Sequence, residues 1–329
     1  MSQKETAKQL KALSGMSILI TGAAGFIGFH LAKKLLESGA KVIGIDNFND
    51  YYAVKFKEER NKLLKKNKAY KMYRGELVNR NFIKKVLKTN KIDKIVNLAA
   101  QAGVRHSLDP YVYFQSNVVG FLNLIHEAKE SSITDFIYAS SSSVYGDAVN
   151  RPSNVSDATD RPMSIYAATK KIDELIAYNY HYLYGLNCTG LRLFTVYGPY
   201  GRPDMAYFSF TDSILKDEAI KVFGSGKMKR DFTYIDDIIS GLVSAIYHSY
   251  PYEIFNLGNG RPIEINTFIG VLENALGRRA KKLYLSRPKV DVIETYANLK
   301  HSKDKLGFAP TIKVEEGLRR FVEWYKQRY

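Results

Sequence analysis

Residues 18–28, ILITGAAGFIG, place three glycines between an apolar run and a helical pattern. A tight strand-to-helix turn needs glycine, and glycine lets a pyrophosphate approach the unpaired backbone N–H groups at the helix start. Gly22, Gly25 and Gly28 follow the spacing GxxGxxG rather than the commoner GxGxxG. A second predicted strand ends on Asp46, about twenty residues further on, where a carboxylate can bind the adenosine ribose hydroxyls and repel a 2′-phosphate. The segment therefore predicts a dinucleotide site that prefers NAD to NADP.

Apolar runs typical of strands alternate with helical patterns through the first half of the chain. Strands are predicted at 17–21, 41–46, 94–99, 136–140 and 255–258, and helices at 25–38, 112–130 and 164–184. Because the strands are apolar almost throughout, the pattern favours a parallel sheet with helices on both faces. After Phe194 the sequence becomes irregular and rich in Gly, Pro and Tyr, which indicates a smaller second lobe that ends in two helices.

The predicted fold class is therefore α/β, a Rossmann-type doubly wound parallel sheet with a smaller C-terminal α/β substrate lobe. We expect residues 1–16 to form a loose tail. The dinucleotide-binding domain is predicted to comprise residues 17–193 and about 233–259, and the substrate lobe about 194–232 and 260–329.

The formal net charge of +16 raises nucleic acid as a possible partner. However, the basic residues are scattered over helical segments such as 57–68 and 318–328, as is typical of solvated helix faces. We therefore expect no nucleic-acid partner. The lone cysteine, Cys188, excludes internal disulfides and cysteine-based zinc sites and fits a reducing compartment. The N-terminus lacks the apolar core of a signal peptide and no apolar run reaches membrane-spanning length, so we expect a cytoplasmic protein with no membrane segment and no metal.

Four serines, residues 140–143, follow the apolar run that begins at Phe136. In a doubly wound sheet, ligands bind beyond the carboxyl ends of the strands, so these hydroxyls are candidates for holding a reacting oxygen. Tyr166 and Lys170 follow at a spacing of four, which puts them on one helix face. A free tyrosine titrates near pH 10, but a neighbouring ammonium and a positively charged nicotinamide ring would favour the phenolate and create a working base.

Each of these patterns also has an ordinary structural explanation, since serines often end strands and YxxxK pairs occur by chance. Their order along one chain makes an accidental match improbable. Together with NLAAQAGV, YASSSSVYG, LRLFTVYGP and RDFTYIDD, they resemble the extended short-chain dehydrogenase/reductase family over nearly the whole chain from Ser17 onward. Within that family, AAQAGVR, SSSSVYG and TVYGPYGRPDMA are similar to the UDP-glucuronate 4-epimerases.

The resemblance implies a role for each matching residue. The catalytic set would be Ser141, Tyr166 and Lys170. The cofactor, NAD, would meet Gly22, Gly25, Phe26, Ile27, Gly28, Asp46, Asn47, Glu76, Leu77, Leu98, Ala99, Ala100, Gln101, Asn117, Tyr166, Lys170 and Val196. The UDP-sugar would meet Arg105, Ser142, Ser143, Thr195, Arg202, Val222, Phe223, Arg230 and Arg287.

Two places depart from the family pattern. Glu76 stands where relatives usually carry Asp before the adenine contact, and RPKVDV replaces the usual Pro-Gly-Asp-Val with one extra residue. The second change affects the nucleotide-side roles of Arg287 and Asp291.

The residues before VYG distinguish the reactions of related enzymes. Dehydratases carry Asp-Glu there, because eliminating water needs an acid and a base, and decarboxylases usually carry Glu. This chain has Ser142 and Ser143. The resemblance therefore implies a UDP-sugar 4-epimerase that works through a 4-keto intermediate with tightly bound NAD, most simply from UDP-glucuronate to UDP-galacturonate. UDP-N-acetylglucosamine, UDP-glucose or an acidic N-acetylated sugar remain alternative substrates, and a non-catalytic NAD- or nucleic-acid-binding protein is the alternative from another class. Relatives also imply a homodimer packed through the helices near Val112 and Ser164.

Overall fold

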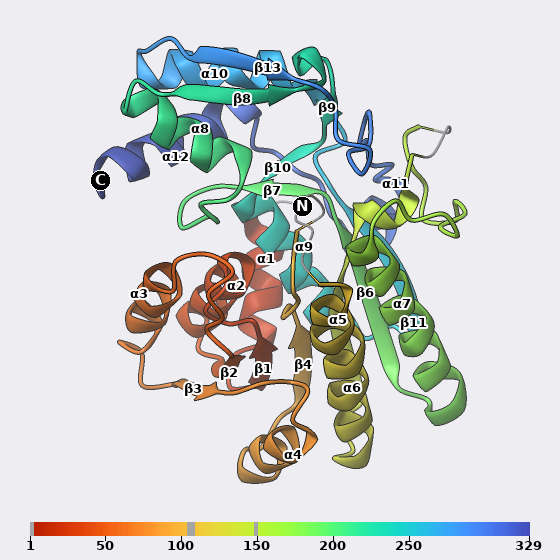
Figure 1. The fold of residues 1–329 in the computed structure, drawn as a ribbon. Helices are drawn as coiled ribbons and strands as arrows, with labels where there is room; N and C mark the ends of the chain where they lie inside the picture. Colours follow the sequence, from red (N-terminus) through yellow and green to blue (C-terminus); the bar gives the residue numbers. More distant parts are fainter. Residues whose placement is uncertain (1–2, 104–108, 148–150) are drawn as a thin grey trace.

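The computed structural model describes residues 3–103, 109–147 and 151–329 (Figure 1). Its centre is a seven-stranded parallel sheet in the order β11-β6-β5-β4-β1-β2-β3. The strands are β1 (Ser17–Thr21), β2 (Lys41–Asp46), β3 (Tyr70–Arg74), β4 (Lys94–Asn97), β5 (Asp135–Ser141), β6 (Asn187–Leu193) and β11 (Tyr252–Leu257). The strand order reverses between β1 and β4, which is where a doubly wound sheet opens a crevice for ligands.

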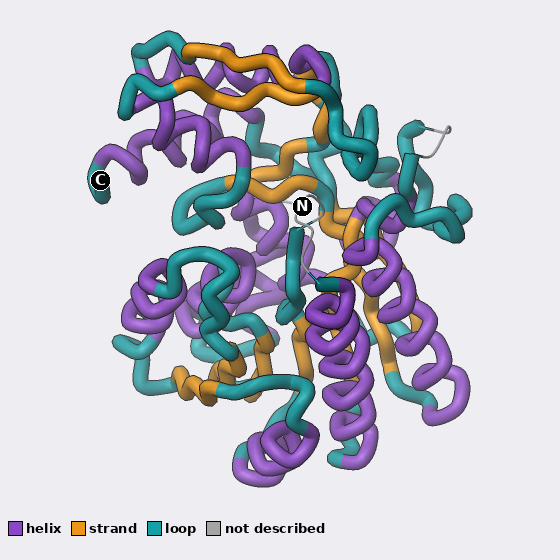
Figure 2. Tube along the Cα trace, viewed as in Figure 1, coloured by secondary structure: helices purple, strands orange, loops and turns teal. Residues whose placement is uncertain are grey.

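Helices cover both faces of this sheet, as the apolar strands predict (Figure 2). One face packs against α1 (Gln3–Ala12), α2 (Phe26–Glu37) and α9 (Ile235–Tyr247), and the other against α4 (Arg80–Thr89), α6 (Gly120–Glu130) and α7 (Ile165–Tyr184). Alternation along the strands separates the two cores. Ile18 and Ile20 of β1 belong to the first, whereas Leu19 belongs to the second.

The smaller lobe contains three two-stranded pairings. They join β7 (Thr195–Tyr197) to β10 (Phe232–Tyr234), β8 (Ala219–Phe223) to β13 (Lys281–Leu285), and β9 (Lys229–Arg230) to β12 (Ile263–Glu264). Its helices are α8 (Ala206–Leu215), α10 (Ile265–Leu276) and α12 (Val314–Lys326), while α11 (Lys300–Leu306) packs beside β11. Figure 1 shows this lobe beyond the carboxyl end of β6.

The remaining elements are α3 (Lys55–Leu64), α5 (Pro110–Tyr113), the π-helix η1 (Phe114–Val119) and the 3₁₀ turns η2 (Ser142–Tyr145) and η3 (Gly224–Gly226). The segment predicted as one helix at 112–130 is helical throughout, but it consists of the end of α5, the π-helix η1 and α6. Within the described part of the chain, no helix is both long and apolar enough to cross a membrane.

The expectation of a loose tail at residues 1–16 is wrong. Helix α1 occupies most of this segment and packs against α9. Leu10 and Leu13 are buried there, and Gln9 Nε2 donates a hydrogen bond of 3.2 Å to Ser244 Oγ. A polar composition hid a narrow apolar stripe, because a helix needs only one face to pack.

Candidate active site

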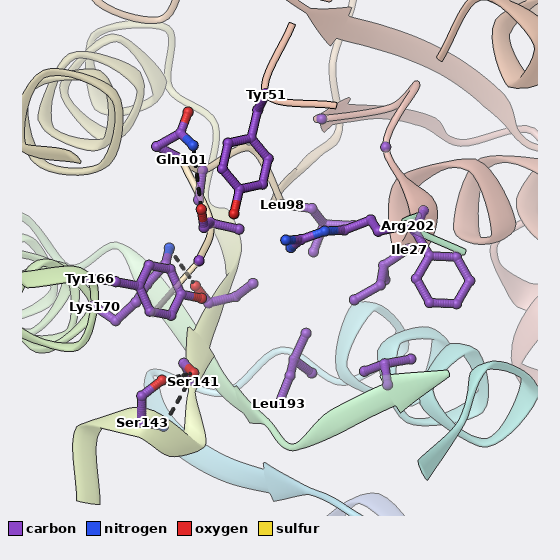
Figure 3. Close-up of a pocket in the computed structure, with 18 of the residues that line it drawn as sticks. Ile27, Tyr51, Leu98, Gln101, Ser141, Ser143, Tyr166, Lys170, Leu193 and Arg202 are labelled. Atoms are coloured by element: carbon purple, nitrogen blue, oxygen red, sulfur yellow. Dashed lines mark hydrogen bonds between the residues drawn. The ribbon is translucent and has the colours of Figure 1, made fainter. Parts of the chain in front are cut away.

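A cavity of about 530 Å³ lies where the sheet meets the smaller lobe (Figure 3). The segments after β1, β2, β4, β5 and β6 line it, together with β7, the residues before α8, and residues 290–292 and 295. The volume is typical of a small-molecule site, and the position is the one predicted for an open α/β sheet. No group of His, Cys, Asp and Glu suited to a metal ion occurs among the residues that the structure describes.

The glycine turn between β1 and α2 requires its glycines. Gly22 has a φ of +67°, and a Cβ there would lie 2.9 Å from the backbone nitrogen of Ala99. At Gly28 a Cβ would lie only 2.1 Å from the carbonyl oxygen of Gly22. Gly25 precedes the helix and contributes no capping side chain, while the first turn of α2 lines the cavity. Unpaired N–H groups at such a helix start attract a phosphate.

Asp46, the last residue of β2, is tied to this turn. Its Oδ2 accepts a hydrogen bond of 3.0 Å from Ala24 N, and its Oδ1 accepts one of 2.9 Å from Phe48 N. Burial raises the pKa of Asp46, although these two backbone donors and the nearby Lys57 act to lower it. The carboxylate is therefore fixed beside the glycine turn on the cavity wall, as a ribose-binding residue would have to be.

The four serines make two kinds of contact. Ser140 is buried and donates a hydrogen bond of 2.6 Å to Glu174 Oε1, so it serves the core. Ser141 accepts a hydrogen bond of 3.2 Å from Ser143 N, and the hydroxyls of Ser141 and Ser143 are hydrogen-bonded to each other. The turn η2 arranges this pair and places Ser142 on the cavity wall as well.

Tyr166 and Lys170 lie on the first turns of α7 and line the same cavity. Ser164 is the N-cap of this helix, since its hydroxyl oxygen accepts a hydrogen bond of 3.1 Å from Ala167 N. Tyr166 is half-buried, and Figure 3 shows its ring beside the cavity, near Lys170. Lys170 is 2% exposed, and its Nζ donates to the carbonyl oxygen of Ala139 at 2.9 Å. The structure thus brings Ser141, Tyr166 and Lys170 together.

Asn117 stands behind the cavity wall and joins it to α7. Its Oδ1 accepts from Gln101 N at 2.7 Å, and its Nδ2 donates to Gln101 O at 3.1 Å and to Thr169 Oγ1 at 2.9 Å. It lies in the π-helix η1, and such segments often occur at functional sites. Asn117 therefore fixes the loop after β4 relative to the helix that carries Lys170.

Arg202 points into the cavity from the smaller lobe, and Figure 3 shows its guanidinium close to Tyr51. It pairs with Asp204, at 3.0 Å from Nε to Oδ1, and lies 5.5 Å from the centre of the Tyr51 ring. Burial raises the pKa of Tyr51 to about 12, although Arg202 acts to lower it, so this phenol stays protonated at neutral pH.

Comparison with known proteins identifies the family of this fold and site. A model of the NAD dependent epimerase/dehydratase family matches residues 18–258. The chain belongs to this family. It is 45% identical to UDP-glucuronate 4-epimerase from Thermodesulfobacterium geofontis, over 94% of this chain and 96% of that one.

Solved structures of UDP-sugar 4-epimerases superpose on most of the chain. UDP-glucuronic acid 4-epimerase from Bacillus cereus, in complex with UDP-glucuronic acid and NAD, matches with a TM-score of 0.90 at 34% identity, over 95% of this chain and 100% of that one. UDP-glucose 4-epimerase from Thermotoga maritima, with UDP-glucose, matches with a TM-score of 0.87 at 30% identity, over 95% and 99% of the two chains.

Most of the residues that the sequence predicts for the site line the cavity described above. They are Gly22, Gly25, Phe26, Ile27, Gly28, Asp46, Asn47, Glu76, Leu77, Leu98, Ala99, Ala100, Gln101, Ser141, Ser142, Ser143, Tyr166, Lys170, Thr195, Val196, Arg202 and Arg230. Glu76, the departure from the family's Asp, accepts hydrogen bonds of 3.2 Å from Asn47 Nδ2 and keeps its place on the wall.

Three of the predicted substrate residues that the structure describes do not join this wall. Val222 is fully buried, so its side chain lies in the core of the lobe rather than against a nucleotide. Phe223 and Arg287 are not among the lining residues, and Arg287 Nη1 instead donates to the carbonyl oxygen of Asp291 at 2.6 Å. Arg105 lies outside the described residues. The longer RPKVDV segment nevertheless brings Val290, Asp291 and Val292 to the cavity.

Sequence reasoning missed the loop between β2 and α3 and the first turn of α3. Asn49, Tyr51, Tyr52 and Lys57 line the cavity, and Lys57 Nζ donates to the carbonyl oxygen of Asn49 at 2.7 Å. Burial lowers the pKa of Lys57, although Asp46 acts to raise it. The available signal was the run NFNDYY directly after the carboxyl end of a predicted strand, which is where this fold binds ligands.

Proposed function

We propose that this protein is an NAD-dependent UDP-sugar 4-epimerase and that it interconverts UDP-glucuronate and UDP-galacturonate. The observation that carries the proposal is the cavity floor, where Tyr166, Lys170 and Ser141 meet beside the hydroxyls of Ser142 and Ser143. These positions supply one proton acceptor and several hydrogen-bonding groups, which suits reversible oxidation better than elimination of water. The 45% identity to a UDP-glucuronate 4-epimerase supports the same substrate.

In this mechanism Tyr166 accepts the proton of the sugar C4 hydroxyl and later returns it to the same oxygen. Bound NAD supplies the redox chemistry, taking the C4 hydride and giving it back to the opposite face. Ser141 donates a hydrogen bond to the C4 oxygen, and the Lys170 ammonium favours the phenolate form of Tyr166. The glycine turn and Asp46 hold the pyrophosphate and ribose of NAD, and the smaller lobe holds the UDP end.

UDP-glucuronate imposes a further requirement on the site. Oxidation at C4 creates a β-keto acid, which loses carbon dioxide when the breaking C–C bond aligns with the carbonyl π system. An epimerase must therefore hold the carboxylate near the carbonyl plane while the ring turns over. Ser142, Ser143 and Thr195 line the cavity and provide hydroxyls for this restraint, with Arg202 entering from the other lobe. Hydrogen bonds to a charged group contribute roughly 1.5–3 kcal/mol each.

The direct test is incubation with UDP-glucuronate, UDP-N-acetylglucosamine and UDP-glucose, followed by NMR identification of the products. Tyr166→Phe protein, which keeps the ring but lacks the proton acceptor, is the matched negative control. UDP-galacturonate formed from UDP-glucuronate without added NAD is the expected result. Conversion of a neutral UDP-sugar alone would establish the second candidate substrate, which the similarity to a UDP-glucose 4-epimerase favours. No conversion of any of the three would refute the epimerase assignment.

We also propose that the protein is a homodimer. Apolar side chains are exposed on the neighbouring elements α5, η1, α6 and α7, namely Tyr111, Val112, Phe114, Val119, Leu122, Ile165, Leu175, Tyr178, Tyr182, Leu183 and Tyr184. Exposed apolar side chains gathered on neighbouring helices are typical of a subunit interface, and a two-fold axis would pair them with those of a second copy. Sedimentation velocity of Leu175→Glu against the matched exposed change Leu283→Glu on β13 tests this. Only the first is expected to produce monomers.

The division into a dinucleotide-binding domain and a substrate lobe, with the bounds given above, is part of the same proposal, as is a cytoplasmic location. The buried thiol of Cys188 accords with a reducing compartment. Partial proteolysis with and without UDP-sugar checks the domain division, because ligand held between two lobes should protect the segments that join them, near residues 194, 232 and 260.

A further inference from the structure

Behind Lys170 lies a carboxylate that the mechanism above does not use. Asp173 follows Lys170 by three residues on α7 and is fully buried. Its Oδ2 accepts a hydrogen bond of 3.0 Å from Lys170 Nζ. Its Oδ1 has no hydrogen-bond partner among the described residues. A buried carboxylate oxygen without a partner is costly, so its presence beside a proposed catalytic lysine calls for a physical reason.

The reason lies in the burial of Lys170. Desolvation, the largest influence, acts to lower the pKa of this ammonium, because a charge loses its hydration when it is buried. The charge of Asp173 is the largest opposing influence, and the pKa of Lys170 ends above its ordinary value. For the carboxyl of Asp173, burial raises the pKa to about 7, although Lys170 acts to lower it.

The carboxylate next to Asp173 already has a cation of its own. Glu174, next to Asp173, binds the guanidinium of Arg192 from β6 through both oxygens, at 2.8 and 2.9 Å. The titratable groups on the elements packed against α7 are Tyr111 and Tyr113 on α5, His126, Glu127, Lys129 and Glu130 on α6, Asp135 and Tyr138 on β5, Tyr145 on η2, Cys188 and Arg192 on β6, and Tyr252 and Glu253 on β11, and η1 has none. Asp173 is thus the carboxylate bonded directly to Lys170, and no other cation of the described residues pairs with it.

We infer that Asp173 is a positioning residue for the reaction: it is the counter-ion that keeps Lys170 charged in a dry site, so that the ammonium can stabilise the Tyr166 phenolate. The inference rests on the proposed epimerase function. It involves no transfer to Asp173, because the proton stays on Lys170 while Tyr166 exchanges its own proton with the sugar.

Asp173→Asn separates charge from geometry, because the amide oxygen can still accept the bond from Lys170 Nζ. Without the counter-charge, desolvation favours neutral Lys170, and Tyr166 then ionises at higher pH. We expect the acid limb of the kcat/KM profile to move upward by about one pH unit or more, the scale of losing one nearby charge. Asp237→Asn is the matched control, since it removes a buried carboxylate of α9 that binds Thr311 N and Ile312 N. Its acid limb should stay in place.

A spectroscopic measurement separates this inference from the epimerase assignment. Tyrosinate absorbance is titrated for the wild-type and Asp173→Asn proteins, each minus its Tyr166→Phe counterpart, so that one tyrosine is observed without turnover. Ionisation of Tyr166 should move upward in the variant, and adding Asp173→Asn to Lys170→Met should produce no further shift. An unchanged or lower ionisation pH in Asp173→Asn would overturn the role of Asp173 even if the enzyme epimerises. A wild type with no activity but the expected shift would instead refute only the epimerase assignment. If Asp173→Asn does not fold, Asp173→Ser removes the same charge and is subject to the same outcomes.

Discussion

Replacing Gly28 by alanine tests whether the glycine turn of this chain is built for close approach. A Cβ at this position would lie 2.1 Å from the carbonyl oxygen of Gly22, 2.8 Å from its carbonyl carbon and 3.0 Å from Ala23 Cα. Real Cβ atoms keep at least 3.0 Å from such neighbours, so the turn and α2 must separate by about 0.9 Å at this contact. All three neighbours are backbone atoms, which cannot turn aside as a flexible side chain can.

The intrinsic preference of helices acts in the opposite direction. Alanine is better than glycine in a helix interior by about 1 kcal/mol, so an exposed Gly→Ala change on a helix stabilises a protein. Gly270 on α10 is the matched control, because nothing lies within 4 Å of a Cβ built there. Gly270→Ala should raise the melting temperature slightly and leave the NAD content unchanged. Gly28→Ala should lose both stability and NAD.

The assay is NAD released from purified protein after acid denaturation, measured beside thermal unfolding of the same samples. We expect wild-type and Gly270→Ala protein to carry NAD, and Gly28→Ala protein to carry at most about one tenth as much, because losing one backbone hydrogen bond to the charged pyrophosphate costs roughly 1.5–3 kcal/mol, or at least about tenfold in affinity. Gly28→Ala protein that retains wild-type NAD would refute the reasoning, since the pyrophosphate would then not depend on the close approach of α2 to the turn.

Four further changes test separate parts of the site and its support. Tyr166→Phe should lower the rate of epimerisation by about three orders of magnitude or more, as expected for loss of a well-placed acid–base group, and activity within tenfold of wild type would remove Tyr166 from the mechanism. Asp46→Asn should weaken NAD and reduce discrimination against NADP, measured as the ratio of the two dissociation constants; a wild type that prefers NADP would contradict the ribose assignment. Ser143→Ala should slow conversion of UDP-glucuronate and raise the fraction of 4-keto-pentose and carbon dioxide among the products, whereas slowing without extra decarboxylation would contradict carboxylate restraint. Burial lowers the pKa of His30 from 6.5 to about 4. The unfolded chain therefore binds a proton at His30 first, and the free energy of unfolding falls as the pH drops below 6.5. His30→Asn should remove about 2 kcal/mol of the loss of unfolding free energy between pH 7 and pH 5, measured by urea unfolding, and an equal loss in both proteins would show that His30 titrates freely.

The sequence predicts the half of the fold in which local pattern and tertiary burial agree. Strands β1 and β2 lie where the apolar runs place them, because both are buried on two faces. Strand β3, Tyr70–Arg74, was not predicted, since it is the sheet edge and carries exposed Lys71 and Arg74. Strand β6 was also missed, because NCTGLRL mixes polar residues into a buried strand, where Arg192 is held by Glu174.

The same distinction explains the candidate site. Motif residues such as Tyr166 and Lys170 can be placed from spacing alone, because one helix sets their geometry. The partners of a site residue come from other elements and leave no mark in local spacing. Tyr51 meets Arg202 only because the loop after β2 and the segment before α8 face one cavity. Likewise, Val222 fits the motif but turns inward, because β8 alternates between the core and the surface of the lobe.

The carboxylate of Glu174 on α7 explains why one of the four serines at the end of the buried strand β5 has a structural role. Glu174 accepts from Ser140 Oγ and binds Arg192 through both oxygens, while Arg192 also donates to Tyr145 Oη at 2.9 Å. This network fastens β5, β6 and η2 to α7 directly beneath the cavity. Ser140 is fixed by its hydrogen bond to Glu174, and the residues that follow it turn into η2 and place Ser141, Ser142 and Ser143 on the cavity wall. The hydrogen bond of Ser140 to Glu174 thus helps to fix the position of the three serines that follow it. Removing the Glu174 carboxylate is expected to change the geometry of Ser141 more than that of the sheet.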